Sequence, residues 1–296
     1  MNGVLVIDKP QGLTSHDVVN RVRRILSQRS VGHLGTLDPS ATGVLPIVLG
    51  SFTRLAQFYL RSEKKYEGAI RFGFATDSYD ADGEPTSAPQ NVALRLEDVR
   101  ALAAEFQGTV KQMPPPFSAK KIDGVPAYKL ARKHKEVRLE PVEVEIKEFV
   151  ILDVAGDRAT FRAHVGSGTY LRSVAHDMGQ KLGCGAHLAG LRRTAVAEFV
   201  IEEAHMLEEL ESAMRQGSVE DLFVHPRKLL PHMPSVTANE ESVALIRTGR
   251  GVNLPEMSRA PLVKVFCGQR ELIAIATRVA GTLFHPGIVF VADTDA

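Results

Sequence analysis

The sequence predicts an α+β protein that has a mixed, mostly antiparallel sheet flanked by helices and a small β-rich domain at its C-terminal end. Helix and strand patterns follow one another irregularly, whereas a doubly wound parallel sheet requires regular alternation. Several apolar strand patterns follow the proline-rich stretch "PHMPSV", which is typical of a linker. With 296 residues, 44% of them hydrophobic, the chain is large enough for two domains, which we expect at residues 1–230 and 236–296.

The first part of the chain predicts strands around a single helix. "GVLVIDKP" has the pattern of a buried strand that a proline ends, and "TSHDVVNRVRRIL" has that of a helix with Thr14 or Ser15 as its N-cap. "VLPIVLG" predicts a further apolar strand. In "YEGAIRFGF" the large apolar residues between Tyr66 and Phe74 alternate, which places them on one face of a strand.

The middle of the chain adds helices and longer strands. "LEDVRALAAEFQG" predicts a helix that a glycine ends, and "PVEVEIKEFVILDV" and "RATFRAHVG" predict two neighbouring strands. "GSGTYLRSVAHDMGQKLG" predicts a glycine turn that leads into a helix. Beyond the linker, "PLVKVFCG", "ELIAIATRV" and "GIVFV" predict the strands of the second domain. The inward face of the helix after the glycine turn is expected to carry five apolar side chains: Leu171, Val174, Ala175, Met178 and Leu182.

Several functional classes are disfavoured by what the sequence lacks. No stretch approaches the roughly 18 consecutive apolar residues of a membrane-spanning helix, and the first residues do not have the pattern of an export signal. The two cysteines, Cys184 and Cys267, form no C-x-x-C pair, so neither a disulfide framework nor a cysteine zinc site is indicated. Phosphate-binding loops, nucleophile elbows and histidine metal motifs do not occur. We therefore expect a cytoplasmic protein that has no metal site.

Charge is distributed unevenly along a chain whose net charge is only +1. Residues 111–138 contain eight Lys or Arg and two acids, whereas residues 202–221 contain seven acids and one Arg. Four arginines in residues 21–29 form a second basic cluster. Uneven charge of this kind gives a nearly neutral protein a positive face that attracts a polyanion. Solvated helices also carry such runs, and for either basic cluster alone that interpretation is preferred.

The stretch "GHLGTLDPSATGVL" is too irregular for a helix or a strand and forms a turn around Asp38. Taken alone, an aspartate before a proline is most simply a turn residue. His33 is most simply a hydrogen-bonded loop residue, and Tyr66 a core residue. Arg172, which follows Tyr170 by two positions at a predicted helix start, is most simply a surface charge. Only the combination of these residues points to a catalytic site.

The order and spacing of six stretches resemble those of the bacterial TruB family of pseudouridine synthases. They are "VIDKPQGLTSHDVV", "GHLGTLDPSATGVLPI", "KKYEG", "TDSYDADG", "MPPPFSAKKIDGVPAYKLAR" and "GSGTYLRSVAHDMG", and the resemblance extends from about residue 3 to about residue 200. It implies a pseudouridine synthase fold, with a PUA-like RNA-binding domain at the C-terminal end. It also implies that the protein converts uridine 55 of the tRNA T-loop to pseudouridine by base flipping and without a cofactor.

The same resemblance implies the catalytic roles. Asp38 matches the family's nucleophile, and Arg172 matches the arginine that pairs with it. A carboxylate in a water-poor pocket tends to protonate unless a cation or hydrogen bonds favour its charged form, which gives such an arginine a physical purpose. Tyr66 matches the tyrosine that stacks on the flipped base. Whether Tyr66 also accepts the C5 proton is left open by the sequence.

Further residues match positions that bind the RNA. His33 matches the histidine that enters the T-loop where the extruded bases had been, and Tyr170 and Leu191 match residues that line the uracil pocket. The basic stretch at residues 111–138 matches the family's insertion, whose lysines would neutralise phosphates. The expected partner is the T-arm of tRNA, and nothing in the sequence demands an oligomer, so we expect a monomer. Three lysines are expected to contact the RNA: Lys9, Lys120 and Lys121.

Two other functions remain open from the sequence alone. The basic insertion and the second domain are also compatible with a module that binds or folds tRNA without catalysis. A metal-free hydrolase that uses Asp38 is compatible with the turn by itself. We disfavour the hydrolase because no histidine or acid is spaced to activate water, and the binding module because it would not need both Asp38 and Arg172.

Overall fold

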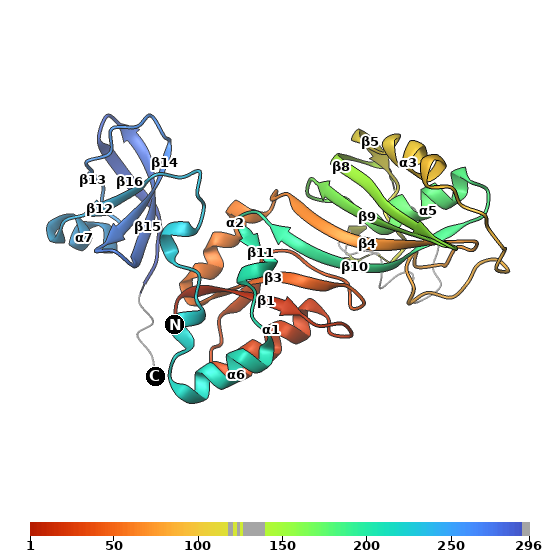
Figure 1. Ribbon diagram of the computed structural model, residues 1–296. Helices are drawn as coiled ribbons and strands as arrows, with labels where there is room; N and C mark the ends of the chain where they lie inside the picture. The colour runs from red at the N-terminus through yellow and green to blue at the C-terminus, as the bar shows by residue number, and fades with distance from the viewer. Residues whose placement is uncertain (118–120, 123–124, 127–139, 292–296) are drawn as a thin grey trace.

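The computed structural model describes residues 1–117, 121–122, 125–126 and 140–291. In this part of the chain, a long sheet with helices packed on it is followed by a separate, smaller sheet at one end of an elongated body (Figure 1). Seven strands form the continuous path of the long sheet. In spatial order they are β1 (Gly3–Lys9), β3 (Thr42–Leu49), β10 (Ala186–Val196), β4 (Lys64–Phe72), β9 (Arg158–Val165), β8 (Val142–Ala155) and β5 (Gly108–Gln112).

The long sheet is mixed but mostly antiparallel, as predicted. Among its described strands, β3 and β10 run parallel, and the other paired neighbours run antiparallel. Two short strands complete the sheet: β2 (Val31–His33) pairs with β3, and β11 (Phe199–Val200) pairs with β10. A separate pair of very short strands comprises β6 (Lys121–Ile122) and β7 (Val125–Pro126).

Helix α1 (Ser15–Ile25) covers the half of the sheet that contains β1 and β3. Of the two predicted N-cap candidates, Thr14 caps the helix: its hydroxyl accepts a hydrogen bond from the backbone N–H of Asp17 at 3.0 Å, while the Asp17 carboxylate accepts from the Thr14 N–H at 2.9 Å. Val18 and Val22 are fully buried, and burial of each such side chain stabilises the fold by about 1.5–3 kcal/mol. Helix α6 (Leu207–Gln216) packs beside α1.

The other half of the sheet, formed by β4, β9, β8 and β5, is covered by α3 (Leu96–Ala104) and α5 (Leu171–Lys181). Strands β4 and β10 run along both halves and join them (Figure 1). One apolar core lies beneath α1 and another beneath α5, and a third joins β1 and β3 to the C-terminal strands. A short 3-10 turn (Gly50–Leu55) and α2 (Ala56–Tyr59) connect β3 to β4.

The C-terminal residues form a five-stranded sheet and one helix, α7 (Glu240–Arg247). Its core contacts the rest of the chain, since Phe52 and Phe290 pack edge to face with ring centroids 4.9 Å apart. The β-rich C-terminal domain is confirmed, and the proposed limits of 1–230 and 236–296 stay a prediction. The strands in spatial order are β12 (Ser235–Ala238), β14 (Leu262–Cys267), β15 (Glu271–Ala280), β16 (Leu283–Val289) and β13 (Val252–Asn253).

The structure differs from the sequence prediction at several places. Leu182 was expected on the inward face of α5, but it is the C-cap residue and is 40% exposed, because Gly183 in a left-handed conformation ends the helix there. Phe74 lies beyond the end of β4 and is half-buried. Strand β10, a central member of the sheet, had no predicted counterpart.

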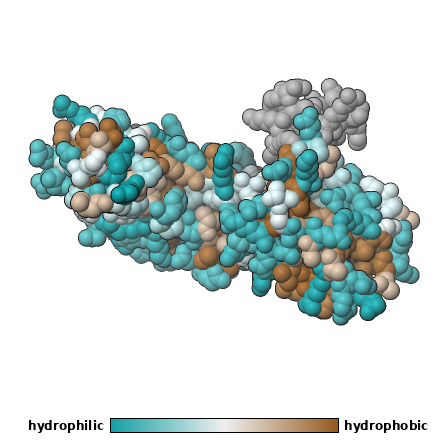
Figure 2. Space-filling view, turned by 90° about the horizontal axis from the view of Figure 1, so that it is seen from above, coloured by the Kyte–Doolittle hydropathy of each residue, from teal (hydrophilic) through white to brown (hydrophobic). Residues whose placement is uncertain are grey.

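The surface of the described chain is mostly hydrophilic on the face shown in Figure 2, with hydrophobic residues in separate areas. The most exposed large apolar side chains are Met257, which is 88% exposed, and Leu60, which is 73% exposed. In the parts of the chain that the structure describes, no helix is long and apolar enough to cross a membrane.

Candidate active site

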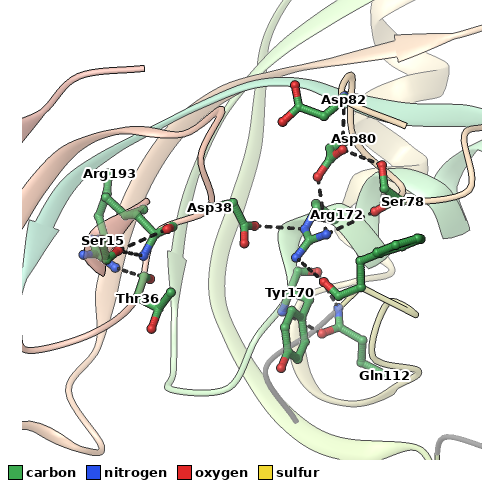
Figure 3. A network of polar contacts seen from close by, with 12 residues as sticks. Ser15, Thr36, Asp38, Ser78, Asp80, Asp82, Gln112, Tyr170, Arg172 and Arg193 are labelled. Atoms are coloured by element: carbon green, nitrogen blue, oxygen red, sulfur yellow. Dashed lines mark hydrogen bonds and ion pairs between the residues drawn. The ribbon is translucent and has the colours of Figure 1, made fainter. Parts of the chain in front are cut away.

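Asp38 lies in the loop between β2 and β3, at the junction of the two halves of the sheet. Its Oδ2 lies 3.0 Å from Nε of Arg172, the second residue of α5 (Figure 3). The Arg172 side chain is only 7% exposed, whereas that of Asp38 is 40% exposed. Among the described residues, Oδ1 of Asp38 takes no hydrogen bond or ion pair, so one carboxylate oxygen is held and the other is available.

The Arg172 guanidinium is held on each of its three nitrogen atoms. Besides the contact of Nε with Asp38, Nη1 donates to the carbonyl of Ser78 at 3.2 Å and lies 3.3 Å from Oδ2 of Asp80, and Nη2 donates to the carbonyl of Phe117 at 3.1 Å. A planar guanidinium with three fixed neighbours has little freedom to rotate. Arg172 therefore presents Nε to Asp38 in one orientation.

Asp80 completes this arrangement from the loop that follows β4. Its Oδ1 accepts hydrogen bonds from the Ser78 hydroxyl at 2.5 Å and from the backbone N–H of Asp82 at 3.2 Å, which leaves Oδ2 to face Arg172. Figure 3 shows both carboxylates next to the Arg172 guanidinium, each joined to it by a dashed line. Two anions thus share one buried cation.

The backbone around Asp38 is fixed by side chains from other elements. Arg193 on β10 donates to the carbonyls of Gly35 and Thr36 at 3.0 and 3.1 Å. Ser15 at the start of α1 donates its hydroxyl to the carbonyl of Leu37 at 3.1 Å and accepts from the N–H of that residue at 2.8 Å. The peptide groups immediately before Asp38 are therefore tied to the sheet and to α1.

Lys9 fixes the other side of the loop. Its Nζ donates to the carbonyl of Pro39 at 3.2 Å and to those of Pro10 and Leu13 at 2.9 and 2.7 Å. The residue is fully buried, and this burial lowers the pKa of Lys9 to about 8, against the opposing charge of Asp38. Lys9 is thus placed to hold the loop, whereas the RNA contact predicted for it needs an exposed ammonium.

Gly43 is required where the loop enters β3. Its φ is +102°, and a Cβ atom there would lie 2.2 Å from the backbone carbonyl oxygen of Arg193. The parallel pairing of β3 with β10 includes Gly43 opposite Arg193. Only glycine allows the two backbones to come this close, so the closing turn of "LDPSATG" depends on it.

The Asp38 carboxyl lies in a groove built from adjoining cavities. A cavity of about 700 Å³ is lined by residues that include Asp38, Asp80, Arg172 and His33. A small cavity of about 20 Å³ shares Asp38 and Arg172 with it, and shares Ser40, Ala81 and Leu191 with a third cavity of about 520 Å³. Cavities that hold small molecules typically measure about 300–1,000 Å³. The groove is therefore large enough to admit a nucleotide.

The electrostatic balance at Asp38 has opposing parts. Burial in the groove raises the pKa of Asp38, the Arg172 charge opposes this rise, and the neighbouring Asp80 carboxylate adds to it. Asp38 therefore retains a basic, and hence more nucleophilic, carboxylate, while the arginine favours its ionised form. A single oriented carboxylate with one available oxygen is suited to nucleophilic attack on an electrophilic carbon.

Comparison with known proteins assigns the chain to a family. A family model described as "TruB family pseudouridylate synthase (N terminal domain)" matches residues 23–171, and one described as "tRNA pseudouridylate synthase B C-terminal domain" matches residues 172–231. The tRNA pseudouridine synthase B of Solibacter usitatus is 51% identical over 292 residues, which cover 98% of this chain and 100% of that protein. The chain belongs to the TruB family. The protein of the same name from Dehalococcoides mccartyi is 38% identical and covers 99% of this chain and 97% of its own length.

Solved structures share the fold of this TruB family member. A chain in the crystal structure of a Cbf5-Nop10-Gar1 complex matches 98% of this chain and 85% of its own length, with a TM-score of 0.71 and 26% identity. A chain in the structure of an H/ACA RNP bound to a substrate RNA containing 2′-deoxyuridine covers 99% and 86%, with a TM-score of 0.71 and 25% identity. The predicted pseudouridine synthase fold with its β-rich C-terminal domain is confirmed.

Tyr66, which was predicted to stack on the flipped base, lies on β4 and is 8% exposed. Its phenol forms a hydrogen bond with Arg193, which occupies the opposite position on β10. Burial raises the pKa of Tyr66, and the Arg193 charge opposes the rise. Arg193 thus connects the Tyr66 hydroxyl to the backbone of the Asp38 loop.

Of the remaining predicted RNA-binding residues, His33 and Leu191 line cavities of the groove. His33 is half-buried, its Nδ1 accepts from the Gly35 N–H at 3.3 Å, and burial lowers the pKa of its imidazole. Tyr170 is the N-cap residue of α5, and Leu191 on β10 lines two of the adjoining cavities. Lys120 lies outside the described residues, as does most of the insertion at 111–138, and Lys121 is described only as the start of β6.

Sequence reasoning did not single out two residues of this site. Asp80 stands in "TDSYDADG", one of the stretches that carry the TruB resemblance, so a signal was present. Arg193 had no signal, because an arginine in "LRRT" is expected at the surface, yet it is fully buried. Among the described residues, no group of three or more His, Cys, Asp or Glu side chains is arranged to hold a metal ion.

Proposed function

We propose that this protein isomerises uridine to pseudouridine at position 55 of the tRNA T-loop, with Asp38 as the nucleophile. The observation that carries the proposal is the pair formed by Asp38 and Arg172, 3.0 Å apart in a groove of nucleotide size. Relatives named tRNA pseudouridine synthase B match this chain over nearly its full length, which supports the same reaction here.

The reaction exchanges one bond to the sugar for another. The ionised Asp38 attacks C1′ of the flipped nucleotide, and the bond from C1′ to N1 breaks with its electron pair on the uracil. The base turns, C5 bonds to C1′, and the carboxylate leaves. N1 gains a proton and C5 loses one, so no atom, electron pair or oxidant enters from outside.

Arg172 serves this sequence by keeping Asp38 ionised and in one orientation. The held Oδ2 leaves the other oxygen for C1′, and the charge of the arginine stabilises the carboxylate when it departs. Tyr66 stacks on the flipped base, and Tyr170 and Leu191 line the uracil pocket. Each of these roles follows from the family match and stays part of the proposal.

A uridine inside a folded T-loop must be extruded before Asp38 can reach its sugar, at a cost of a few kcal/mol. His33, on the wall of the largest cavity of the groove, is placed to enter the space that the extruded bases leave. Lysines of the insertion at 111–138, Lys120 and Lys121 among them, neutralise phosphates, so that binding weakens steeply with salt. We further propose that the protein acts in the cytoplasm as a monomer.

The proposal is tested by incubating the purified full chain with an unmodified tRNA transcript and mapping pseudouridine at single-nucleotide resolution. Pseudouridine at position 55, and none in a transcript with cytidine there, is the expected result. Failure to form pseudouridine while the protein still binds and refolds tRNA would replace the enzyme with the binding or folding module. Turnover of a phosphate ester or glycoside with no change in the RNA would favour a hydrolase.

A further inference from the structure

Two aromatic rings, one from the loop that carries Asp80 and one from α5, stack on each other. The rings of Tyr79 and His176 have centroids 3.7 Å apart and lie within 14° of parallel. Tyr79 belongs to the loop after β4, and His176 lies on α5. Both residues are half-buried. Nothing in the proposed reaction uses either of them.

Tyr79 and His176 lie on the same two segments as Asp80 and Arg172. Tyr79 immediately precedes Asp80, and His176 lies four residues after Arg172, one turn further along the same face of α5. Successive loop residues therefore contact successive turns of the helix. The stack of rings is a second connection between the same two segments that Asp80 and Arg172 join.

The backbone of this loop adopts an unfavourable conformation at Tyr79, which contacts with the surrounding structure must stabilise. The φ of Tyr79 is +67°, in the left-handed region that bulky residues rarely adopt. The Tyr79 carbonyl also accepts a hydrogen bond from the N–H of Leu188 on β10 at 3.0 Å. This turn directs Tyr79 toward His176 and leaves Asp80 directed toward Arg172, on the side of Asp38.

His176 contributes through the face of its ring. Its Nδ1 is buried and has no hydrogen-bond partner among the described residues. Burial lowers the pKa of His176, which favours the neutral imidazole at neutral pH. A neutral aromatic ring without a hydrogen bond to this loop acts on the loop by stacking. Another flat aromatic side chain at position 176 should therefore be able to take the place of the imidazole.

We propose that Tyr79 and His176 are positioning residues for the reaction at Asp38: their stacked rings hold the loop so that Asp80 orients Arg172. This role rests on the proposed function, and it adds two residues that touch neither the substrate nor Asp38. Each acts only through the other and through the loop, so the two should behave as one unit.

The test is a double-mutant cycle on the full chain. Tyr79→Asn removes the ring but keeps a residue that tolerates a left-handed backbone, and His176→Ala removes the other ring. His176→Phe restores a flat ring. Gln180→Ala, at an exposed position further along α5, is the matched control for a substitution on that helix. The single-turnover rate constant, the Kd for tRNA and the melting temperature are measured for each variant, with rates measured well below melting.

Each ring removal should lower the single-turnover rate constant about three- to tenfold, as expected for the loss of one aromatic pair. The Kd of these variants for tRNA should stay within about twofold of the wild-type value. The single-turnover rate constants of His176→Phe and of the Gln180→Ala control should also stay within about twofold of the wild-type value. The double variant should be no slower than the slower single variant. A lower melting temperature without a change in rate would show a merely structural role and overturn the proposal.

Two further outcomes are equally decisive. A loss of rate in Tyr79→Asn with none in His176→Ala would mean that the tyrosine acts on the RNA by itself, which contradicts a stacked unit. Rate losses that multiply in the double variant would contradict it as well. A wild-type protein that forms no pseudouridine would overturn the proposed function and this role together, whereas an active wild type with unaffected variants overturns this role alone.

Discussion

The Nε of Arg172 lies 3.0 Å from Oδ2 of Asp38, and only 7% of the arginine side chain is exposed. Arg172 is the buried member of this ion pair, and its removal takes away the cation that faces the partly exposed Asp38 carboxylate. Asp38 would then lose the cation that opposes the rise of its pKa. The central chemical property of the site is therefore set by a residue that need not touch the substrate.

Arg172→Met should lower the single-turnover rate constant for pseudouridine formation by roughly 100-fold or more, because Asp38 loses the cation that orients it and favours its ionised form. Arg71→Met is a matched control, because Arg71 forms an ion pair of 2.8 Å with Asp157 in which both side chains are 39% exposed. That control should change the rate by less than about threefold. Equal losses in the two variants would contradict the role assigned to Arg172.

Asp80→Asn should move the acid limb of the pH profile of kcat/KM to lower pH. The nucleophile works only when ionised, so activity is present above the pKa of Asp38 and is lost as the pH falls through it. The Asp80 carboxylate raises that pKa, and an amide removes its charge. The maximal rate should fall at the same time, since Arg172 loses a partner. An acid limb that stays in place or moves upward would contradict the charge coupling.

Arg193→Met should destabilise the fold by about 2–5 kcal/mol, because it removes a buried cation together with its hydrogen bonds. The neighbouring Arg192 offers a control on the same strand. Its pair with Asp8 is 2.7 Å long, but the arginine side chain is 41% exposed, so Arg192→Met should cost less than about 1 kcal/mol. Urea unfolding monitored by circular dichroism gives both values, and similar losses would count against the fixing of the Asp38 loop by Arg193.

Gly43→Ala should destabilise the protein by about 2–5 kcal/mol, since it adds a steric clash to an unfavourable backbone conformation. Gly12→Ala separates the two effects. Gly12 also has a positive φ, +88°, but a Cβ there would meet no atom within 4 Å, so only the backbone cost of about 1–2 kcal/mol applies. Urea midpoints of the two variants provide the comparison, and equal shifts would show that the contact with β10 is unimportant.

Elements with a regular pattern were predictable from the sequence. Helix α1 was expected from its apolar spacing and a cap at Thr14 or Ser15, and the paired strands β8 and β9 were expected from alternation. Strand β10 was not, because "AHLAGLRRTAV" mixes glycine and two arginines with apolar residues. An alternating pattern of apolar and polar residues indicates which face of a strand is buried. A strand that buries an arginine does not show this pattern, because an arginine is expected to be exposed.

The site was predictable only in part for a related reason. The resemblance to the TruB family supplied Asp38, Arg172 and Tyr66 as candidates, and the structure brings Asp38 and Arg172 into contact. The roles of Asp80 and Arg193 depend on contacts between segments distant in sequence, which neither composition nor spacing reveals. Lys9 shows the same limit, since its burial at the base of the loop follows from tertiary packing.

The most direct test of the whole account is the Asp38→Asn variant assayed with tRNA that carries tritium at C5 of its uridines. The amide keeps the size of the side chain but removes the nucleophilic charge. The account predicts complete tritium release at uridine 55 by the wild-type protein and none by the variant, with equal Kd values for tRNA. Full tritium release by Asp38→Asn would contradict it.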